Sequence, residues 1–176
     1  MDTKYRPAAQ KMERLHMGKA KIPATTAIRF LKQHKVKFIP HPYPYEEKGG
    51  TRASARALNI DEFSIIKTLI MEDDQQRPFI MLMHGSCNVS EKHLARQLKV
   101  KKVSPCSVEK AERITGYQAG GISPFGTRQT LPVYLEASIK NLETIWINGG
   151  KRGLLVELKP ADLTRTLQPA EVSVAI

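Results

Sequence analysis

The chain reads Gly116-Tyr117-Gln118-Ala119-Gly120-Gly121-Ile122-Ser123-Pro124-Phe125-Gly126, and this stretch contains four of its eleven glycines. Glycine adopts positive φ angles and lets a backbone approach a ligand closely. A Gly-Gly pair followed by Ser-Pro therefore predicts a shaped loop whose N–H groups can point at an anion or at a developing oxyanion. A tight turn between two strands has the same composition, so the stretch by itself leaves both interpretations open.

The size and composition of the chain are those of one globular domain. It has 176 residues, of which 41% are hydrophobic and 26% are charged, enough to bury a substantial core. No apolar run approaches the ~20 residues of a membrane span, and the basic N-terminus lacks the apolar region of a secretory signal. We therefore expect a cytoplasmic protein, in which Cys87 and Cys106 are two buried thiols.

The formal net charge of +11 is the second informative quantity. A field of this sign attracts polyanions, although a solvated surface that only maintains solubility would have it too. Basic clusters at residues 29–37, 92–102 and 151–152 favour a nucleic-acid partner. Aromatic residues make up only 6% of the chain, which argues against a base-stacking platform for a single strand and favours backbone contact with a folded RNA.

Hydrophobic periodicity, caps and breakers predict a mixture of helices and strands after a basic, flexible N-terminal arm at residues 1–22. Helices are expected at residues 25–35, 51–58, 90–98, 108–114 and 160–167, and extended segments at 36–39, 65–71, 79–83, 131–136, 144–148 and 154–158. Residues 65–71 and 79–83 should pair. The elements do not alternate as regular βαβ units, so a doubly wound parallel sheet is not expected and residues 23–176 form one α+β domain.

Three motifs occur in an order and spacing that are specific only in combination. They are Lys67-Thr68-Leu69, the loop from Thr115 to Gly126, and the run Gly149-Gly150-Lys151-Arg152-Gly153-Leu154. From about residue 25 to 167, the chain resembles the YbaK-type aminoacyl-tRNA deacylases, which include the Cys-tRNA(Pro) editing enzymes. The resemblance implies an α+β fold in which peripheral helices surround a single mixed, largely antiparallel, barrel-like sheet with one cleft. It also implies hydrolysis of the ester of a mischarged aminoacyl-tRNA without a metal.

The resemblance assigns catalytic roles to Lys67, Gly120 and Gly121. Alternation along the strand places Lys67 on the opposite face from Ile66, so the pattern alone is also typical of an outward-facing lysine. In the family, the matching lysine is required and lies in the cleft. The backbone N–H groups of the Gly-Gly pair are expected to stabilise the oxyanion of ester hydrolysis.

Substrate-binding roles are expected for Tyr43, Ile122 and Ser123. Tyr43 is held between two prolines and matches a tyrosine that lines the family's cleft, while Tyr45 is a weaker candidate. Ser123 has no Gly-x-Ser-x-Gly elbow and no assignable histidine base, so we interpret its hydroxyl as shaping the loop rather than as a nucleophile.

The third motif adds Asn148, Gly149, Lys151 and Arg152 to the expected substrate site. Backbone amides and two cations here suit a phosphate, although the spacing is not that of a P-loop, and a charged hairpin turn is the alternative. The chain departs from the family twice: Asn148 stands where serine is common, and Leu155 stands where aspartate is common. The second change removes a charge and a hydrogen-bond acceptor.

We expect no metal, because neither the five histidines nor the two cysteines show ligand spacing. The leading hypothesis is a trans-editing hydrolase that deacylates Cys-tRNA(Pro) or a related small-amino-acid tRNA(Pro), with tRNA as partner and prolyl-tRNA synthetase as a second partner to test. The alternatives are a non-catalytic tRNA- or synthetase-binding module of the same fold, and an esterase acting on small molecules. The net charge and the missing nucleophile elbow disfavour the esterase.

Overall fold

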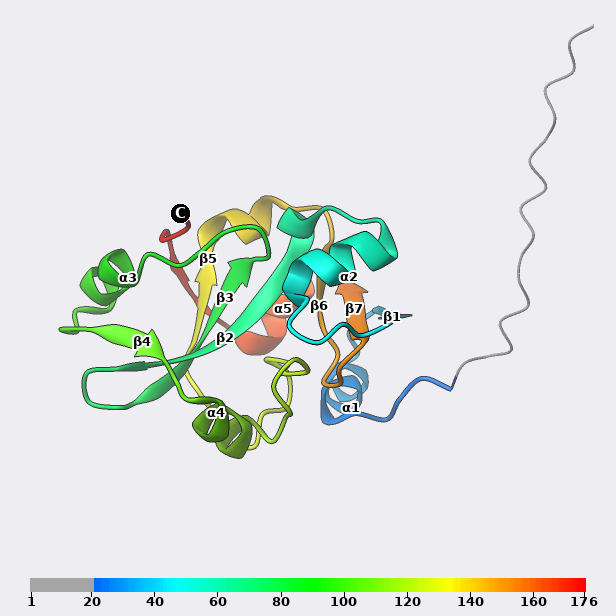
Figure 1. Ribbon diagram of the computed structural model, residues 1–176, viewed down its shortest axis with the longest axis horizontal. Coiled ribbons are helices and arrows are strands. Elements are labelled where there is room, and N and C mark those ends of the chain that lie inside the picture. The colour runs from blue at the N-terminus through cyan, green and yellow to red at the C-terminus, as the bar shows by residue number, and fades with distance from the viewer. Residues whose placement is uncertain (1–20) are drawn as a thin grey trace, which may run out of the picture.

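The computed structural model describes residues 21–176. The arm predicted for residues 1–22 lies outside this range except for its last two residues. The described chain contains five α-helices and eight strands (Figure 1). In chain order they are α1 Thr26–Gln33, β1 Ile39–Pro42, α2 Gly50–Leu58, β2 Ile65–Asp73, β3 Pro78–His84, α3 Glu91–Leu98, β4 Val103–Pro105, α4 Val108–Thr115, β5 Val133–Glu136, β6 Ile145–Asn148, β7 Leu154–Leu158, α5 Pro160–Leu167 and β8 Ala170–Val172.

The helices begin and end where local chemistry predicts. The hydroxyls of Thr25, Ser90 and Ser107 each accept a hydrogen bond from the backbone N–H three residues further on, at the starts of α1, α3 and α4. Gly116 ends α4 with φ of 77°, a conformation that glycine adopts without strain. All five predicted helices are present within a few residues of their expected bounds.

The sheet is mixed and open. Its order is β1-β7-β6-β2-β3-β5-β8, and β4 pairs with β2 beside this path. Four pairings are antiparallel, and three (β2 with β6, β3 with β5, β5 with β8) are parallel. The predicted α+β class with a single mixed sheet is confirmed, and the sheet does not close into a barrel. Strands β4 and β8 were not predicted, because three residues are too few for a periodic pattern.

The first strand begins later than predicted, at Ile39, and contains two prolines. The N–H of Tyr43 donates to the Gly153 carbonyl of the β7 side, so the odd-numbered residues here face β7. The backbone nitrogens of Pro40 and Pro42 consequently face the free edge of the sheet. Because proline has no N–H, no hydrogen bond within the sheet is lost there, and a further strand cannot pair with this edge.

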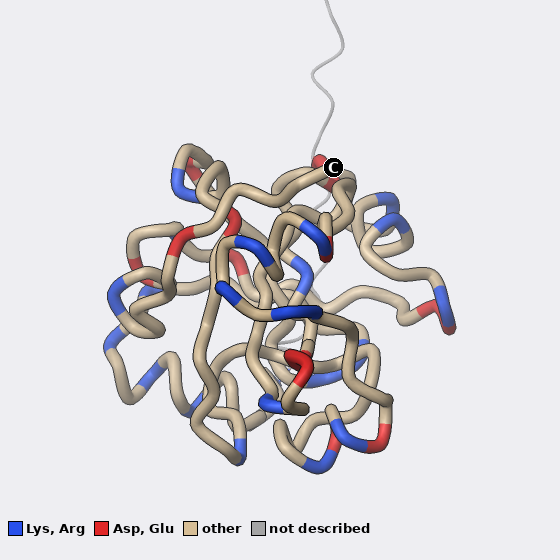
Figure 2. Tube along the Cα trace, turned by 90° about the vertical axis from the view of Figure 1, so that its left-hand side faces the viewer, with Lys and Arg blue, Asp and Glu red and all other residues tan. Residues whose placement is uncertain are grey.

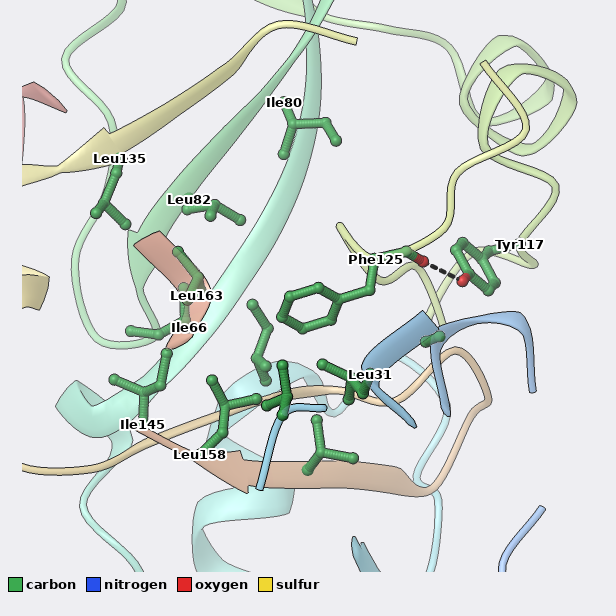
Figure 3. Close-up of a cluster of buried hydrophobic side chains, with 14 of the residues drawn as sticks. Leu31, Ile66, Ile80, Leu82, Tyr117, Phe125, Leu135, Ile145, Leu158 and Leu163 are labelled. Carbon is green, nitrogen blue, oxygen red and sulfur yellow. Dashed lines mark hydrogen bonds between the residues drawn. The ribbon is translucent and has the colours of Figure 1, made fainter. Parts of the chain in front are cut away.

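One face of the sheet carries the main core. Ile66, Ile80, Leu82 and Phe125 are buried there together with apolar residues of α1, α4 and α5. Figure 3 shows the Phe125 ring pointing into this core, and its carbonyl accepts a hydrogen bond from the Tyr117 hydroxyl. The glycine-rich stretch is therefore anchored in the core at its C-terminal end.

The opposite face carries two smaller clusters. One packs methionines of β2 and β3 against Leu94 of α3, and the other packs Ile65 and Leu155 against Ala55 of α2. In Figure 1, α3 lies beside β4 and α2 lies near β6 and β7, so the two helices cover different ends of the sheet. This separation leaves room on that face for a cleft.

Candidate functional site

The cleft begins at a gap along one edge of β2. The N–H of Gly85 donates to the Ile65 carbonyl, and the N–H of Asp73 donates to the Arg77 carbonyl. Odd-numbered residues of β2 therefore direct their backbone groups at β3, and even-numbered residues direct theirs at the other edge. That other edge is shared by two strands, since β6 pairs with residues 65–66 and β4 pairs with residues 71–73.

Thr68 lies in the middle of this gap. By the alternation of the strand, its N–H and C=O face the open edge, while the neighbouring Ile70 carbonyl is already bonded to the Cys106 N–H at 2.9 Å. Within residues 21–176, the N–H and C=O of Thr68 make no loop or turn hydrogen bond, and neither β6 nor β4 pairs with Thr68. The Thr68 Oγ1 is also the one buried side-chain polar atom of these residues without a hydrogen-bond partner. The gap thus presents backbone hydrogen-bonding capacity to a ligand.

A cleft of about 610 Å³ opens over this edge. A second hollow of about 410 Å³ adjoins it, and the two share residues of β2, of α4 and of the glycine-rich loop. The shared residues are Thr68, Leu69, Val108, Ala119 and Ile122. Both hollows therefore meet where the glycine-rich loop faces the open edge of β2.

Lys67 lies on the floor of the cleft. Its side chain points to the face of the sheet opposite Ile66, as the alternation predicts. At Lys67 that face forms part of the cleft lining and is not an open surface. Its Nζ donates to the Cys87 carbonyl. Desolvation by burial lowers the pKa of Lys67, and the charges of Cys87 and Glu62 oppose the shift. The side chain is a fixed point charge.

Tyr43 forms part of the cleft wall and is half-buried. Burial raises the pKa of its phenol, and the neighbouring Tyr45 adds to the shift. The hydroxyl therefore stays protonated at neutral pH and can donate a hydrogen bond.

The two central glycines of the loop have different surroundings. Gly120 lines the cleft with φ of +86°, and a Cβ there would lie 2.7 Å from the Tyr45 hydroxyl oxygen. Gly121 faces the other way, where a Cβ would lie 2.7 Å from the Arg152 backbone nitrogen. The Gly121 N–H donates to the Gln118 carbonyl at 2.8 Å, so it is not free for an oxyanion in this conformation.

The N–H groups of Gly120 and Ile122 remain available. In the described part of the chain neither donates a hydrogen bond, and both residues line the cleft. Ser123 is fully buried outside the cleft lining, and its Oγ accepts from the Phe125 N–H at 3.3 Å. Its contacts are those of a hydroxyl that shapes the loop.

The run from Gly149 to Gly153 is the hairpin turn between β6 and β7. Asn148 Oδ1 accepts from the N–H groups of Gly150 (2.7 Å) and Lys151 (3.2 Å), and the Gly149 N–H donates to the Leu154 carbonyl at 3.0 Å. The N–H groups of Gly149, Gly150 and Lys151 are thus bonded within the turn, whereas those of Arg152 and Gly153 donate no hydrogen bond within the described residues. The run forms a charged hairpin turn, and its role in binding a phosphate stays a prediction.

Asn148 and Arg152 connect this turn to the glycine-rich loop. Asn148 Nδ2 donates to the Gly120 carbonyl at 3.3 Å, and Arg152 Nε donates to the Ala119 carbonyl at 2.7 Å. The Arg152 guanidinium also lies 5.2 Å from the centroid of the Tyr45 ring. Three loops therefore meet at one side of the cleft.

The cleft brings together Tyr43, Lys67, Gly120, Ile122, Asn148 and Arg152, whereas Gly121, Ser123, Gly149 and Lys151 lie outside its lining. Sequence reasoning missed the open edge at Thr68 and the contribution of α2, and it gave Tyr45 too little weight. Leu155, at 4% exposure, forms an apolar wall where the family commonly has an acid.

The two cysteines differ from the expectation of buried thiols. Cys87 and Cys106 are free and partly exposed. The Cys106 thiol lies 3.6 Å from a Glu72 carboxylate oxygen, and burial, with the Glu72 charge, raises its pKa to about 11. Among residues 21–176, no three His, Cys, Asp or Glu side chains are grouped to hold a metal ion, and no helix is long and apolar enough to cross a membrane.

Residues 46–166, which contain most of the cleft lining, match the family model for the aminoacyl-tRNA editing domain. The chain belongs to this family. It is 32% identical over 137 residues to the "Putative Cys-tRNA(Pro)/Cys-tRNA(Cys) deacylase EbsC" of Enterococcus faecalis, which covers 77% of this chain and 84% of that protein. It is 24% identical over 110 residues to a proline–tRNA ligase of Limosilactobacillus reuteri, covering 57% of this chain and 19% of the ligase.

Solved structures show the same fold. A "putative trans-editing enzyme for prolyl tRNA synthetase" superposes with a TM-score of 0.74 at 19% identity, covering 88% of this chain and 99% of that one. A hypothetical protein superposes with a TM-score of 0.78 at 16% identity, covering 86% and 99%. The YbaK-type fold predicted from the three motifs is confirmed.

Proposed function

We propose that this chain is a trans-editing hydrolase that deacylates mischarged tRNA, with Cys-tRNA(Pro) or another small amino acid on tRNA(Pro) as substrate. One observation carries the proposal: the cleft gathers Lys67, the free amides of the glycine-rich loop and the Asn148 turn in a chain of the editing-domain family. The Enterococcus relative is named as a putative deacylase of Cys-tRNA(Pro), which supports the choice of substrate. Synthetases misload near-isosteric amino acids and need a separate hydrolytic step.

The ester carbonyl would lie between the glycine-rich loop and the open edge of β2. There the N–H groups of Gly120 and Ile122 would donate to the oxyanion, and the Thr68 N–H faces the same space. Lys67 would hold the RNA terminus or the ester region by its charge. A water oxygen adds to the carbonyl carbon while the ribose hydroxyl of the substrate accepts its proton. The tetrahedral oxyanion then re-forms the carbonyl, and the 3′ oxygen leaves with a proton passed to it by the ribose 2′ hydroxyl, so the products are the free amino acid and the deacylated tRNA.

The walls of the cleft suit a small uncharged side chain. Leu155, Ile65 and Ala53 are buried apolar residues of its lining. A charged side chain placed against these three residues would lose hydration. An uncharged amino acid such as cysteine suits this wall and agrees with the name of the Enterococcus relative.

The remaining assignments follow from the same proposal. Residues 23–176 act as the editing domain and residues 1–22 as a basic arm. The enzyme would work in the cytoplasm without a metal and with tRNA as its partner. Prolyl-tRNA synthetase is a second partner, in line with the match to part of a proline–tRNA ligase.

The proposal is tested by deacylation of Cys-tRNA(Pro), Ala-tRNA(Pro) and Pro-tRNA(Pro), with wild type beside Lys67→Ala and Lys67→Arg. We expect the wild type to hydrolyse a mischarged ester and spare Pro-tRNA(Pro). Lys67→Ala should lose ~100-fold or more in kcat/KM, and Lys67→Arg should recover part of it because the charge returns. A control is Lys159→Ala, which removes an exposed cation just before α5, outside the cleft lining and outside the three basic clusters. Cleavage of none of the esters by the wild type refutes the proposal.

A second candidate function is a non-catalytic module that binds tRNA or a synthetase. Leu155 favours it, because an apolar side chain fills the position of a common family acid in the cleft wall. This candidate predicts that aminoacylated tRNA binds with no ester cleavage across a wide aminoacyl panel.

A further inference from the structure

One aromatic ring stands exposed at the mouth of the cleft. Tyr45 is 39% exposed and lines the cleft beside Gly120 and Arg152. Its hydroxyl lies against Gly120, where a Cβ would come within 2.7 Å. The ring therefore offers an accessible aromatic surface at the mouth of the cleft.

The Arg152 guanidinium lies next to this ring. It lies over the Tyr45 ring at 5.2 Å from the centroid, and its Nε is bonded to the Ala119 carbonyl. Within the described residues no ion pair or further hydrogen bond engages its two terminal nitrogens. A fixed guanidinium plane beside a tyrosine ring offers both a stacking surface and donors for a phosphate.

The charge around the pair matches an anionic partner. Lys48 is exposed and lines the cleft just before α2, Arg52 is exposed within α2, and Lys151 is exposed beside Arg152. Glu46 and Glu47 also line the cleft: the Glu46 carboxylate is bonded to Arg56 at 2.6 Å, and Glu47 forms no ion pair within the described residues. Figure 2 shows that Lys and Arg outnumber Asp and Glu along the trace and are distributed over many elements. The exposed cations beside the pair favour a partner that carries phosphates.

We propose that Tyr45 and Arg152 form a stacking platform for one unpaired nucleobase at the 3′ end of the RNA substrate. The inference rests on the proposed function, because the aminoacyl ester that would enter the cleft is attached to that single-stranded end. Aromatic and guanidinium planes are the usual partners of splayed RNA bases. The low aromatic content of the chain argues against an extended platform, and one base requires only one ring.

The test measures binding, so it does not depend on turnover. The probe is an RNA stem-loop ending in single-stranded CCA, with alanine joined to its 3′ end by a non-hydrolysable amide. The Kd is measured for wild type, Tyr45→Phe and Tyr45→Ala, with the normal RNA and with RNAs abasic at the terminal or the penultimate nucleotide. Arg56→Ala is the control for charge alone, because it removes an exposed cation and frees the Glu46 carboxylate on the rim while the ring stays in place.

Tyr45→Ala should weaken binding of the normal RNA ~10-fold, and Tyr45→Phe should stay within ~2-fold because the ring remains. The loss caused by Tyr45→Ala should vanish with one of the two abasic RNAs, which identifies the stacked nucleotide. Arg56→Ala should weaken all three RNAs equally. An unchanged Kd for Tyr45→Ala overturns the inference, and so does a loss that persists with both abasic RNAs, since the ring would then only brace the loops. Neither result depends on whether the wild type cleaves esters, which decides the proposed function separately.

Discussion

At the residue scale, Asn148 uses hydrogen-bonding capacity that distinguishes it from the serine expected at this position. Its Oδ1 organises the hairpin turn by accepting from the N–H groups of Gly150 and Lys151, and its Nδ2 holds the Gly120 carbonyl. A serine is shorter and has a single hydroxyl, so it cannot make all three contacts at once. Asn148 is therefore a positioning residue for the glycine-rich loop.

Asn148→Asp separates its two roles. One carboxylate oxygen of the aspartate can still accept from the N–H groups of the turn. The other oxygen replaces the Nδ2 donor, so it repels the Gly120 carbonyl oxygen. We expect the free energy of unfolding in urea to change by only ~1 kcal/mol, while kcat/KM for deacylation falls ~10-fold because Gly120 moves. Asn148→Ala should lose both activity and ~1–2 kcal/mol of stability. Wild-type rates in Asn148→Asp would show that the link to Gly120 has no functional role.

At the scale of elements, the segment from α4 to β5 is held by Tyr117. This tyrosine follows the end of α4, is 6% exposed, and donates its hydroxyl to the carbonyl of Phe125. Burial raises the pKa of Tyr117 from 10.0 to about 12. The protonated form is therefore favoured in the folded state, and its contribution to stability is complete below pH 10 and is lost as the pH rises towards 12.

Tyr117→Phe tests this anchor. At pH 8, removing the hydroxyl leaves the Phe125 carbonyl unpaired, and we expect a loss of ~1–3 kcal/mol in the free energy of unfolding. The difference between wild type and variant should shrink between pH 10 and about 12, because ionisation then favours the unfolded wild type. Denaturant unfolding of both proteins at several pH values measures it. A difference independent of pH would contradict the assignment.

At the scale of the whole molecule, charge and cleft must act together. The net charge of the chain is +11, and among the described residues lysines and arginines occur on many elements rather than on one (Figure 2). It therefore supports encounter with a large polyanion, and selectivity must come from the cleft.

The salt dependence of deacylation follows from this division. We expect KM for an aminoacyl-tRNA to rise ~10-fold or more between about 50 and 200 mM salt, because bound cations are released from the phosphates on association. Hydrolysis of a simple amino acid methyl ester, if any, should change little over the same range. Salt-insensitive deacylation of tRNA would instead support the small-molecule esterase.

The sequence by itself determined which residues form each helix and most strands, because caps, breakers and periodicity act over a few neighbouring residues. Thr25, Ser90 and Gly116 show this: each sets a helix end through a backbone group within about four residues. The three motifs were also sufficient for the family, since their order is a property of the chain.

Only the tertiary structure decided which of those groups are free to act. The Gly121 N–H is not available to an oxyanion because it donates to the Gln118 carbonyl within the loop. Whether Lys67 lies in a cleft or on an open surface depends on the elements that pack on its face of the sheet. The open edge at Thr68 exists because β6 and β4 pair with opposite ends of β2. These partners lie up to about eighty residues away in the sequence, so no local pattern contains them, and burial and hydrogen-bond occupancy are settled only when the chain packs.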